Sequence, residues 1–287
     1  MKIVSKIVLS MAFALLITLS FTSYVQAEAF KSMSFGGATG LISTPTAHTG
    51  WDLDGKGKDN RIGLDLGYHY VHYDKKETGA EGSVYHLPKA LVHIGVAGTS
   101  LELGFTYDMQ PDWPDNSKTN DMLFNAKWVF VKGLAIGGSY QRMDLNGNGY
   151  KDEKSNDKQF YIAATYEGTF FTMPAETTIV VGHTFYGKKN RIDNENKNVD
   201  LSMGFDLDLL PKYLKGYVHW INDFANYSYS TEPGGADALH RGCFNTGLRF
   251  AFLQKKYKYK LNLDVIMTDA LDHNRDWAVG ATFGIAL

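Results

Sequence analysis

Apolar and polar residues alternate with a period of two along most of this chain. From position 62 to 70 the even positions are apolar or aromatic, whereas the odd positions from 61 to 69 are Arg61, Gly63, Asp65, Gly67 and His69. Successive side chains of a β-strand point to opposite faces, so one face is apolar and the other is polar or small. The same alternation recurs in 100–109, 197–208, 241–252 and 257–268. It predicts a chain built of strands.

Twelve such segments can be placed along the chain. They are 61–73, 84–97, 100–109, 119–131, 134–144, 158–170, 175–187, 197–208, 213–224, 241–252, 257–268 and 275–287. Alternation is weakest in 175–187 and 213–224, so ten or fourteen strands remain alternatives. Long connections (74–83, 110–118, 145–157, 188–196, 225–240, 269–274) take turns with short ones (98–99, 132–133, 171–174, 209–212, 253–256). Long outer loops and short periplasmic turns are typical of outer-membrane barrels.

We therefore expect an all-β fold, a transmembrane antiparallel up-and-down β-barrel of about 12 strands. A soluble β-sandwich or lipocalin-like barrel is the alternative, because it also alternates. Segments of about ten residues with aromatic residues near their ends favour the membrane barrel. The expected location is the outer membrane, with outer-membrane lipid and lipopolysaccharide around the barrel.

The N-terminus has the pattern of a secretory signal peptide. Lys2 and Lys6 precede the apolar run 7–19, and Val25-Gln26-Ala27 ends the segment. A single membrane anchor is the alternative, but the run is short for one. We expect three parts: a signal peptide at 1–27, an N-terminal segment at 28–60 that is a plug or a periplasmic extension, and a barrel at 61–287.

Composition narrows the function. The chain has 29 basic and 31 acidic residues and a formal charge of −2, which gives no footprint for nucleic acid. The single cysteine, Cys243, cannot form a disulfide within the chain. No cofactor is expected.

Two short motifs resemble known families. The last segment resembles the C-terminal strand signal read by the barrel-assembly machinery, through Gly280, Phe283 and Ile285, although Leu287 replaces the usual final aromatic residue. Gly40-Leu-Ile-Ser-Thr-Pro-Thr-Ala47 resembles the N-terminal motif of YjbH-type outer-membrane barrel proteins. That resemblance implies a link to exopolysaccharide production. Without it, the segment is a strand or turn at the barrel mouth, or a small plug whose glycines permit close packing.

Candidate chemistry is sparse. Asp144, Asn146 and Asn148 followed by Gly149 fit the first half of a calcium loop, but Ser155 stands at position 12 where a glutamate is needed. The stretch 51–59 is interpreted as a solvated turn. The nine histidines show no metal-binding spacing, so no metal site is expected. Ser139 has no evident base and no G-x-S-x-G motif occurs, so an enzyme is not expected and a lipid hydrolase is the least favoured alternative.

The inward face of the barrel carries charges of both signs. The predicted lumen-lining residues are Arg61, Asp65, His69, Glu102, Asp108, Lys127, Asp200, Asp206, Asp208, Arg249 and Asp264. We place Lys127 and Arg249 opposite the three aspartates of 197–208, and we expect inward glycines such as Gly63, Gly204 and Gly280 to leave space. The sequence favours a narrow channel for small hydrophilic solutes or carbohydrate. The alternative is a non-conducting component or scaffold of exopolysaccharide production or export.

Overall fold

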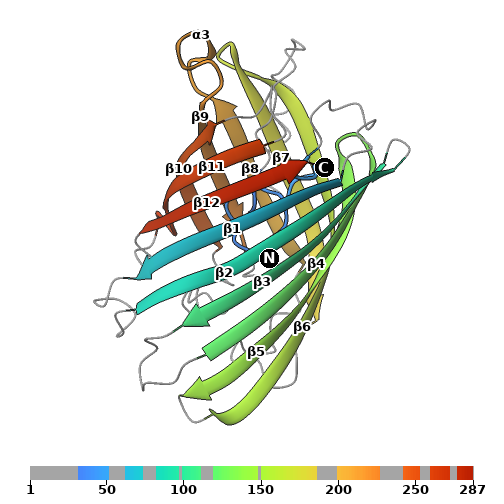
Figure 1. Cartoon of the computed structure of the whole chain (residues 1–287), viewed down its shortest axis with the longest axis vertical. Coiled ribbons are helices and arrows are strands. Elements are labelled where there is room, and N and C mark those ends of the chain that lie inside the picture. Colours follow the sequence, from blue (N-terminus) through green and yellow to red (C-terminus); the bar gives the residue numbers. More distant parts are fainter. Residues whose placement is uncertain are drawn as a thin grey trace, which may run out of the picture.

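The chain folds as a closed sheet of twelve antiparallel strands, as seen in a computed structural model (Figure 1). The structure describes residues 32–51, 62–73, 82–96, 99–110, 119–147, 150–185, 199–226, 242–252, 259–271 and 277–286. The strands are β1 (Ile62–Tyr73), β2 (Gly82–Val96), β3 (Thr99–Gln110), β4 (Thr119–Val131), β5 (Leu134–Gly147), β6 (Tyr150–Phe170), β7 (Met173–Phe185), β8 (Asp200–Asp208), β9 (Val218–Ala225), β10 (Cys243–Phe252), β11 (Tyr259–Met267) and β12 (Trp277–Ala286). The helix α3 (Pro211–Leu214) lies between β8 and β9.

Each strand pairs with its neighbours in sequence, and β1 pairs with β12. The last pairing runs from Gly63 opposite Ala286 to Val71 opposite Ala278. The predicted all-β, antiparallel, up-and-down arrangement is confirmed. The predicted signal peptide and Arg61 lie outside the described residues.

The apolar positions of the alternation point outward. Leu66 is 50% exposed, Ile162 58% and Phe283 44%, whereas their sequence neighbours on the inward face, such as Asp65 and Thr282, are buried. Among the described residues, no helix is long and apolar enough to cross a membrane. The barrel wall is therefore apolar outside and polar inside, the inverse of a soluble domain.

Two expected connections differ from the structure. Residues 145–157 were expected to form a long loop, but β5 and β6 continue as a hairpin in which Asp144 pairs with Lys154 and Gly147 with Tyr150. The stretch is polar, yet its described residues form the ends of two strands. The calcium interpretation requires a loop at this position, so it does not fit the structure. Conversely, a short turn was expected at 209–212, but the connection between β8 and β9 is longer, because Pro211 begins the one-turn helix α3.

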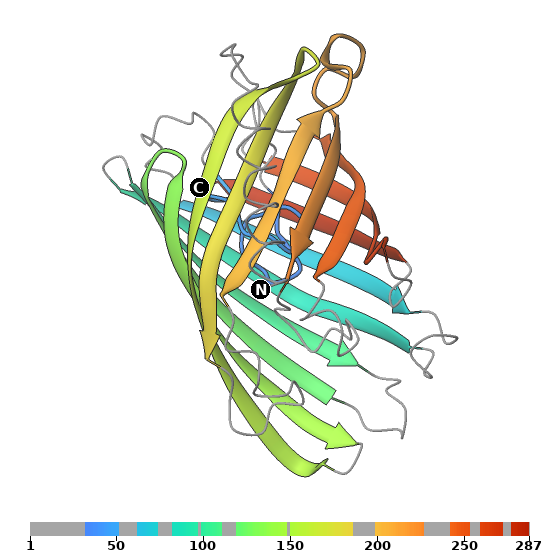
Figure 2. The same cartoon turned by 180° about the vertical axis from the view of Figure 1, so that it is seen from behind.

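We call the end of the barrel that holds the turns 132–133 and 171–172 the short-turn end, and the opposite end the long-loop end. The wall is uneven between them. The strand β6 has 21 residues and β9 has 8, so the wall around β5 and β6 extends further towards the long-loop end (Figures 1 and 2).

The inward face of β12 is lined by small residues. They are Ala278, Gly280, Thr282 and Gly284. In register, Gly284 lies between Asp65 of β1 and Lys260 of β11, and Gly280 lies between His69 and Asp264. A Cβ atom on Gly284 would collide with the Asp65 carboxylate and with Lys260. Glycine at this position therefore allows charges two strands apart to meet across β12.

Candidate functional site: the lumen and the segment inside it

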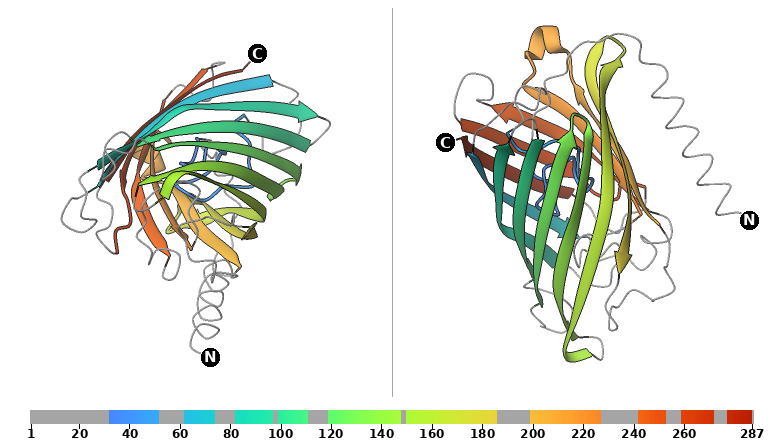
Figure 3. Two further views of the ribbon diagram at one scale, coloured as in Figure 1. Left: turned by 90° about the horizontal axis from the view of Figure 1, so that it is seen from below. Right: turned by 90° about the vertical axis from the view of Figure 1, so that its right-hand side faces the viewer.

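Residues 32–51 lie within the barrel, and we call them the lumen segment (Figures 2 and 3). All of them are buried except Ser43, which is half-buried. The segment folds on itself: Phe35 N–H donates to the Ile42 carbonyl at 2.7 Å, and Leu41 N–H donates to the Thr44 carbonyl at 2.9 Å. Several of its other backbone groups bond to side chains of the wall.

Asp223 of β9 binds the turn of the segment at residues 41–44. Its Oδ2 atom accepts the backbone N–H groups of Ile42 at 3.0 Å, Ser43 at 2.5 Å and Thr44 at 2.8 Å. Its Oδ1 atom accepts from the Asn245 amide at 3.0 Å. Successive N–H groups in a tight turn form a concave anion site, and here the anion is a carboxylate of the wall.

Glu102 and Lys127 hold a second point of the segment. They are opposite each other on β3 and β4, and Lys127 Nζ lies 3.1 Å from Glu102 Oε1. Glu102 accepts from Thr39 N–H at 2.8 Å and Thr39 Oγ1 at 2.6 Å, while Lys127 donates to the Thr39 carbonyl at 2.8 Å. Both charges are buried, and each also satisfies a backbone group of the segment.

Arg249 and Asp264 form the third contact. They face each other on β10 and β11 in a bidentate ion pair, with N–O distances of 2.9 and 3.0 Å. Two of the three remaining guanidinium hydrogens donate to the carbonyls of Gly40 at 3.2 Å and Leu41 at 3.0 Å. The fork geometry of arginine permits both sets of bonds at once.

The end of the segment is held at the short-turn end. Trp51 Nε1 donates to Asp65 Oδ1 at 2.8 Å, and Lys260 Nζ lies 2.6 Å from Asp65 Oδ2. Lys260 also donates to the Gly50 carbonyl at 2.5 Å and lies over the Trp51 ring, 4.8 Å from its centroid. A Cβ on Gly63 would collide with that ring. The space left by this inward glycine is therefore filled by Trp51.

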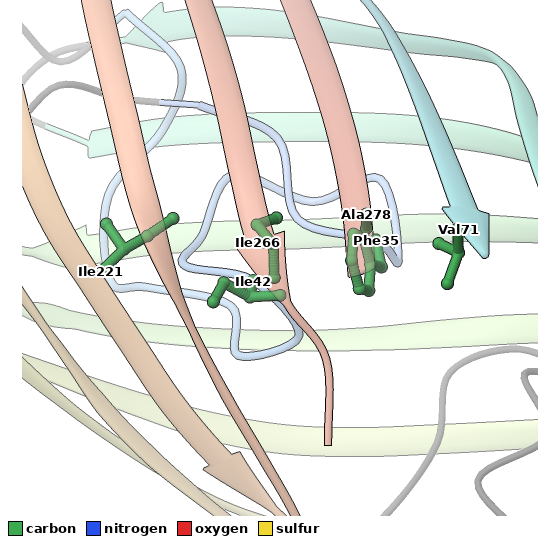
Figure 4. Close-up of a cluster of buried hydrophobic side chains, with 6 residues drawn as sticks. All are labelled: Phe35, Ile42, Val71, Ile221, Ile266 and Ala278. Atoms are coloured by element: carbon green, nitrogen blue, oxygen red, sulfur yellow. The ribbon is translucent and has the colours of Figure 1, made fainter. Parts of the chain in front are cut away.

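Apolar contacts complete the packing. Phe35 and Ile42 of the segment lie among Val71, Ile221, Ile266 and Ala278 (Figure 4). Ala47 packs in a second cluster with Val129, Ala135, Tyr161, Ala163 and Val180. The inward face thus has two apolar patches, and apolar side chains of the segment pack against each of them.

The carboxylates of β7 and β8 have a different environment. Asp200 accepts from Gln159 at 2.7 Å and from Thr184 at 2.5 Å. Asp206 Oδ1 lies 2.5 Å from His219 Nδ1, and Asp208 is half-buried nearby. The transverse arrangement expected from the sequence is wrong: Lys127 and Arg249 pair with carboxylates on neighbouring strands, because adjacent strands bring opposite charges closer than the far wall can.

The other predicted lumen residues are placed as follows. His69 contacts Phe35 edge-on, with ring centroids 5.1 Å apart, and its Nε2 atom lies 3.9 Å from Asp264 Oδ2. Asp108 pairs with Asp121 in the β3–β4 register, and its side chain lies outside the described part. Ser139 lies between Asn125 and Gln159 in cross-strand register. The expectation that Gly204 and Gly280 leave open space is also wrong, since their inward sides meet Leu41 and His69.

Several contact residues were not predicted from the sequence. Asp223 was missed because Asn222 and Asp223 are both polar and buried, which breaks the alternation in β9. Asn125, which donates to the Gly36 carbonyl, and Thr165, which accepts from Ala47 N–H at 2.8 Å, are ordinary inward residues in the sequence. A usable signal was the inward apolar set at Val71, Ile266 and Ala278, which indicates that something packs there.

No protein-family model matches the chain, and no curated protein sequence matches it. Solved structures with a similar arrangement of strands are outer-membrane barrels. The KdgM porin in complex with disordered oligogalacturonate is 12% identical, with 77% of this chain and 98% of that chain covered and a TM-score of 0.41. The translocator domain of the autotransporter NalP from Neisseria meningitidis is 12% identical, with 81% and 90% covered and a TM-score of 0.46. An outer-membrane channel from Pseudomonas putida F1 is 11% identical, with 79% and 96% covered and a TM-score of 0.41.

Proposed function

We propose that this protein is an outer-membrane barrel that forms a passage for small hydrophilic solutes or carbohydrate, and that the lumen segment closes the passage. The outer-membrane location is supported by the apolar outward face and the polar, buried inward face. Outer-membrane lipid and lipopolysaccharide would surround the wall, and the barrel-assembly machinery would insert it. The orientation proposed puts the short-turn end in the periplasm.

One observation carries the closed state: five charged residues that would line an open lumen are bonded to the backbone of the lumen segment. Lys127, Arg249 and Lys260 all donate to its carbonyls, and Glu102 and Asp223 accept from its N–H groups. If the segment left, these groups would face water, as in a hydrophilic pore. The wall is thus suited to both an occupied and a hydrated lumen.

Hydrogen bonds rather than covalent links hold the segment in place. Many of them must break together, so opening needs a compensating partner such as a bound solute or a periplasmic protein. Once the segment leaves, Asp200, Asp206 and Asp208 would add negative charge to the pore, so the open pore should prefer cations.

Planar-bilayer conductance of refolded wild type and of a variant lacking residues 32–51 tests this. A difference in gel migration between unheated and heated protein serves as the control that both barrels have formed. We expect little or no conductance from wild type and a cation-preferring pore from the deletion. Replacing Asp206 and Asp208 by asparagine in the deletion should lower that preference, measured by reversal potential. Equal, large conductance from both proteins would contradict closure by the segment.

A non-conducting scaffold for exopolysaccharide production or export is the second candidate. The YjbH-like stretch Gly40–Ala47 supports it, because this stretch makes the contacts with Asp223 and Arg249 and so belongs to the best-held part of the lumen. A permanently filled lumen would then be the working state. Absence of conductance from both wild type and the formed deletion barrel would favour this reading.

A further inference from the structure

Three carboxylates lie side by side on the inward face near the short-turn end. In register, Glu176 of β7 is opposite Glu167 of β6 on one side and Asp206 of β8 on the other. Like charges directly opposite on neighbouring strands destabilise a sheet unless a cation lies between them. The row therefore needs positive charge.

The basic side chains at this row come from outside the three strands. Lys132 Nζ lies 3.0 Å from Glu167 Oε2, but this lysine is half-exposed in the turn 132–133. His219 of β9 meets Asp206. His48 of the lumen segment is buried, and its Nε2 atom lies 3.3 Å from Glu176 Oε2.

His48, Glu167 and Glu176 together have the donor set of a divalent cation site. One ligand atom from each lies within 4.8 Å of the others. Imidazole nitrogen with carboxylate oxygen is a ligand set that Zn²⁺ uses at three-residue sites, with water as the fourth ligand. Ligand atoms around tetrahedral Zn²⁺ are about 3.4 Å apart, so closure from a spread of 4.8 Å requires a movement of up to about 1.4 Å. Glu167, the least buried of the three, can supply it by leaving Lys132.

We propose that these three side chains bind a divalent cation of the Zn²⁺ class. Such an ion would neutralise the row and join the lumen segment, through His48, to β6 and β7. The neighbouring bonds already align the parts: Ala47 N–H donates to Thr165 Oγ1 at 2.8 Å, and Thr165 and Thr178 hydroxyls are 2.9 Å apart. Binding of the ion does not depend on whether the barrel conducts.

Isothermal titration of the tag-free, refolded full chain with Zn²⁺ tests the site. Wild type should bind one ion per chain, and His48→Ala and Glu176→Gln should each weaken binding by about tenfold or more. His183→Ala is the matched control, because His183 lies at the other end of β7 and should leave Zn²⁺ affinity unchanged. Heat-modifiable migration must be retained, and Glu167→Gln serves as the variant at the less buried ligand if His48→Ala fails to form a barrel.

The Lys132→Ala variant gives a test of sign. The Lys132 ammonium of the wild type competes with a metal ion for Glu167. Removing the ammonium should therefore strengthen Zn²⁺ binding several-fold. A purely structural cluster would show no Zn²⁺ binding to strengthen. Three results would each overturn the proposal. They are undetectable Zn²⁺ binding by wild type, Zn²⁺ affinities of His48→Ala and Glu176→Gln equal to that of wild type, and binding of Ca²⁺ and Mg²⁺ without binding of Zn²⁺.

Discussion

Two parts of the lumen wall meet the same segment with different charge arrangements. In the first part, formed by β1, β3, β4, β10 and β11, the inward carboxylates Asp65, Glu102 and Asp264 each have a lysine or arginine partner within 3.1 Å. We call this the paired wall. In the second part, β6 to β8, the carboxylates Glu167, Glu176, Asp200, Asp206 and Asp208 meet histidines, neutral donors and one half-exposed lysine. We call this the acidic wall.

The difference concerns what holds the lumen segment. In the paired wall the charges cancel on neighbouring strands or, for Asp65 and Lys260, across β12, and most of these residues also bind segment backbone. In the acidic wall negative charge is left in excess and the segment contributes His48 to offset it. The paired wall should therefore dominate stability, whereas the acidic wall should respond to added cations.

The largest effect is expected in the paired wall, at Lys127. Replacing it by methionine leaves Glu102 buried and unpaired, which costs about 3–5 kcal/mol in the free energy of unfolding. Guanidinium unfolding in lipid vesicles, followed by tryptophan fluorescence, measures it. The double variant Glu102→Gln, Lys127→Met should lose less than the two single losses added, and strict additivity would refute the coupling.

Asp223→Ala measures how much a carboxylate stabilises the segment through accepted N–H groups alone, without an ion pair. This carboxylate has no lysine or arginine within ion-pair distance among the described residues, yet its loss removes the acceptor of three backbone N–H groups. We expect a loss of roughly 3 kcal/mol. In addition, hydrogen exchange of residues 42–44 should rise. Asn226→Ala is the control, because Asn226 bonds to Leu201 and Val199 rather than to the segment. Unchanged exchange in Asp223→Ala, or an equal rise in Asn226→Ala, would show that Asp223 does not hold the segment.

Gly284→Ala tests how closely the paired wall is packed across β12. The added Cβ meets Asp65, Lys260 and Trp51 at once, so the expected cost is about 1–2 kcal/mol in the same unfolding assay. Ala281→Val is the control on the same strand, since Ala281 is on the opposite, half-exposed face. An equal response to both changes would mean that the inward glycine is not needed for the ion pair.

The smallest effect is expected for Lys132→Ala beside the acidic wall. Its ion pair with Glu167 is half-exposed, and such pairs contribute about 0–1 kcal/mol. Unfolding without added metal should therefore change little. A loss as large as that of Lys127→Met would erase the distinction between the two walls.

Much of the fold could be predicted from the sequence because strand faces follow a local rule. The segment 61–73 was predicted as a strand, and β1 spans Ile62–Tyr73, since each residue's face is set by its neighbours. The rule fails where polar residues continue a strand, as in the β5–β6 hairpin, because they were interpreted as a loop. It also fails where a proline starts a helix after β8.

The lumen contacts could be predicted only in part. Inward residues such as Asp65 and Arg249 follow from alternation, but their partners depend on which strands become neighbours and on what fills the lumen. The Asp223 contact joins residues almost 180 positions apart, and its donors are backbone groups without a sequence signature. The role of Gly284 depends on side chains from β1, β11 and the lumen segment, none of which is local to it.

The central claim is that residues 32–51 occupy the lumen. The Ser32 and Thr282 hydroxyls are 3.3 Å apart, one on the segment and one on the inward face of β12. In a Cys243→Ala background, cysteines at 32 and 282 should form a disulfide in the membrane-inserted barrel under mild oxidation, detected by mass spectrometry of peptides. Cysteines at 32 and 283, where residue 283 faces outward, should remain reduced. A contradiction would be free thiols in the 32/282 pair, together with rapid labelling of Cys at 32 by a water-soluble maleimide.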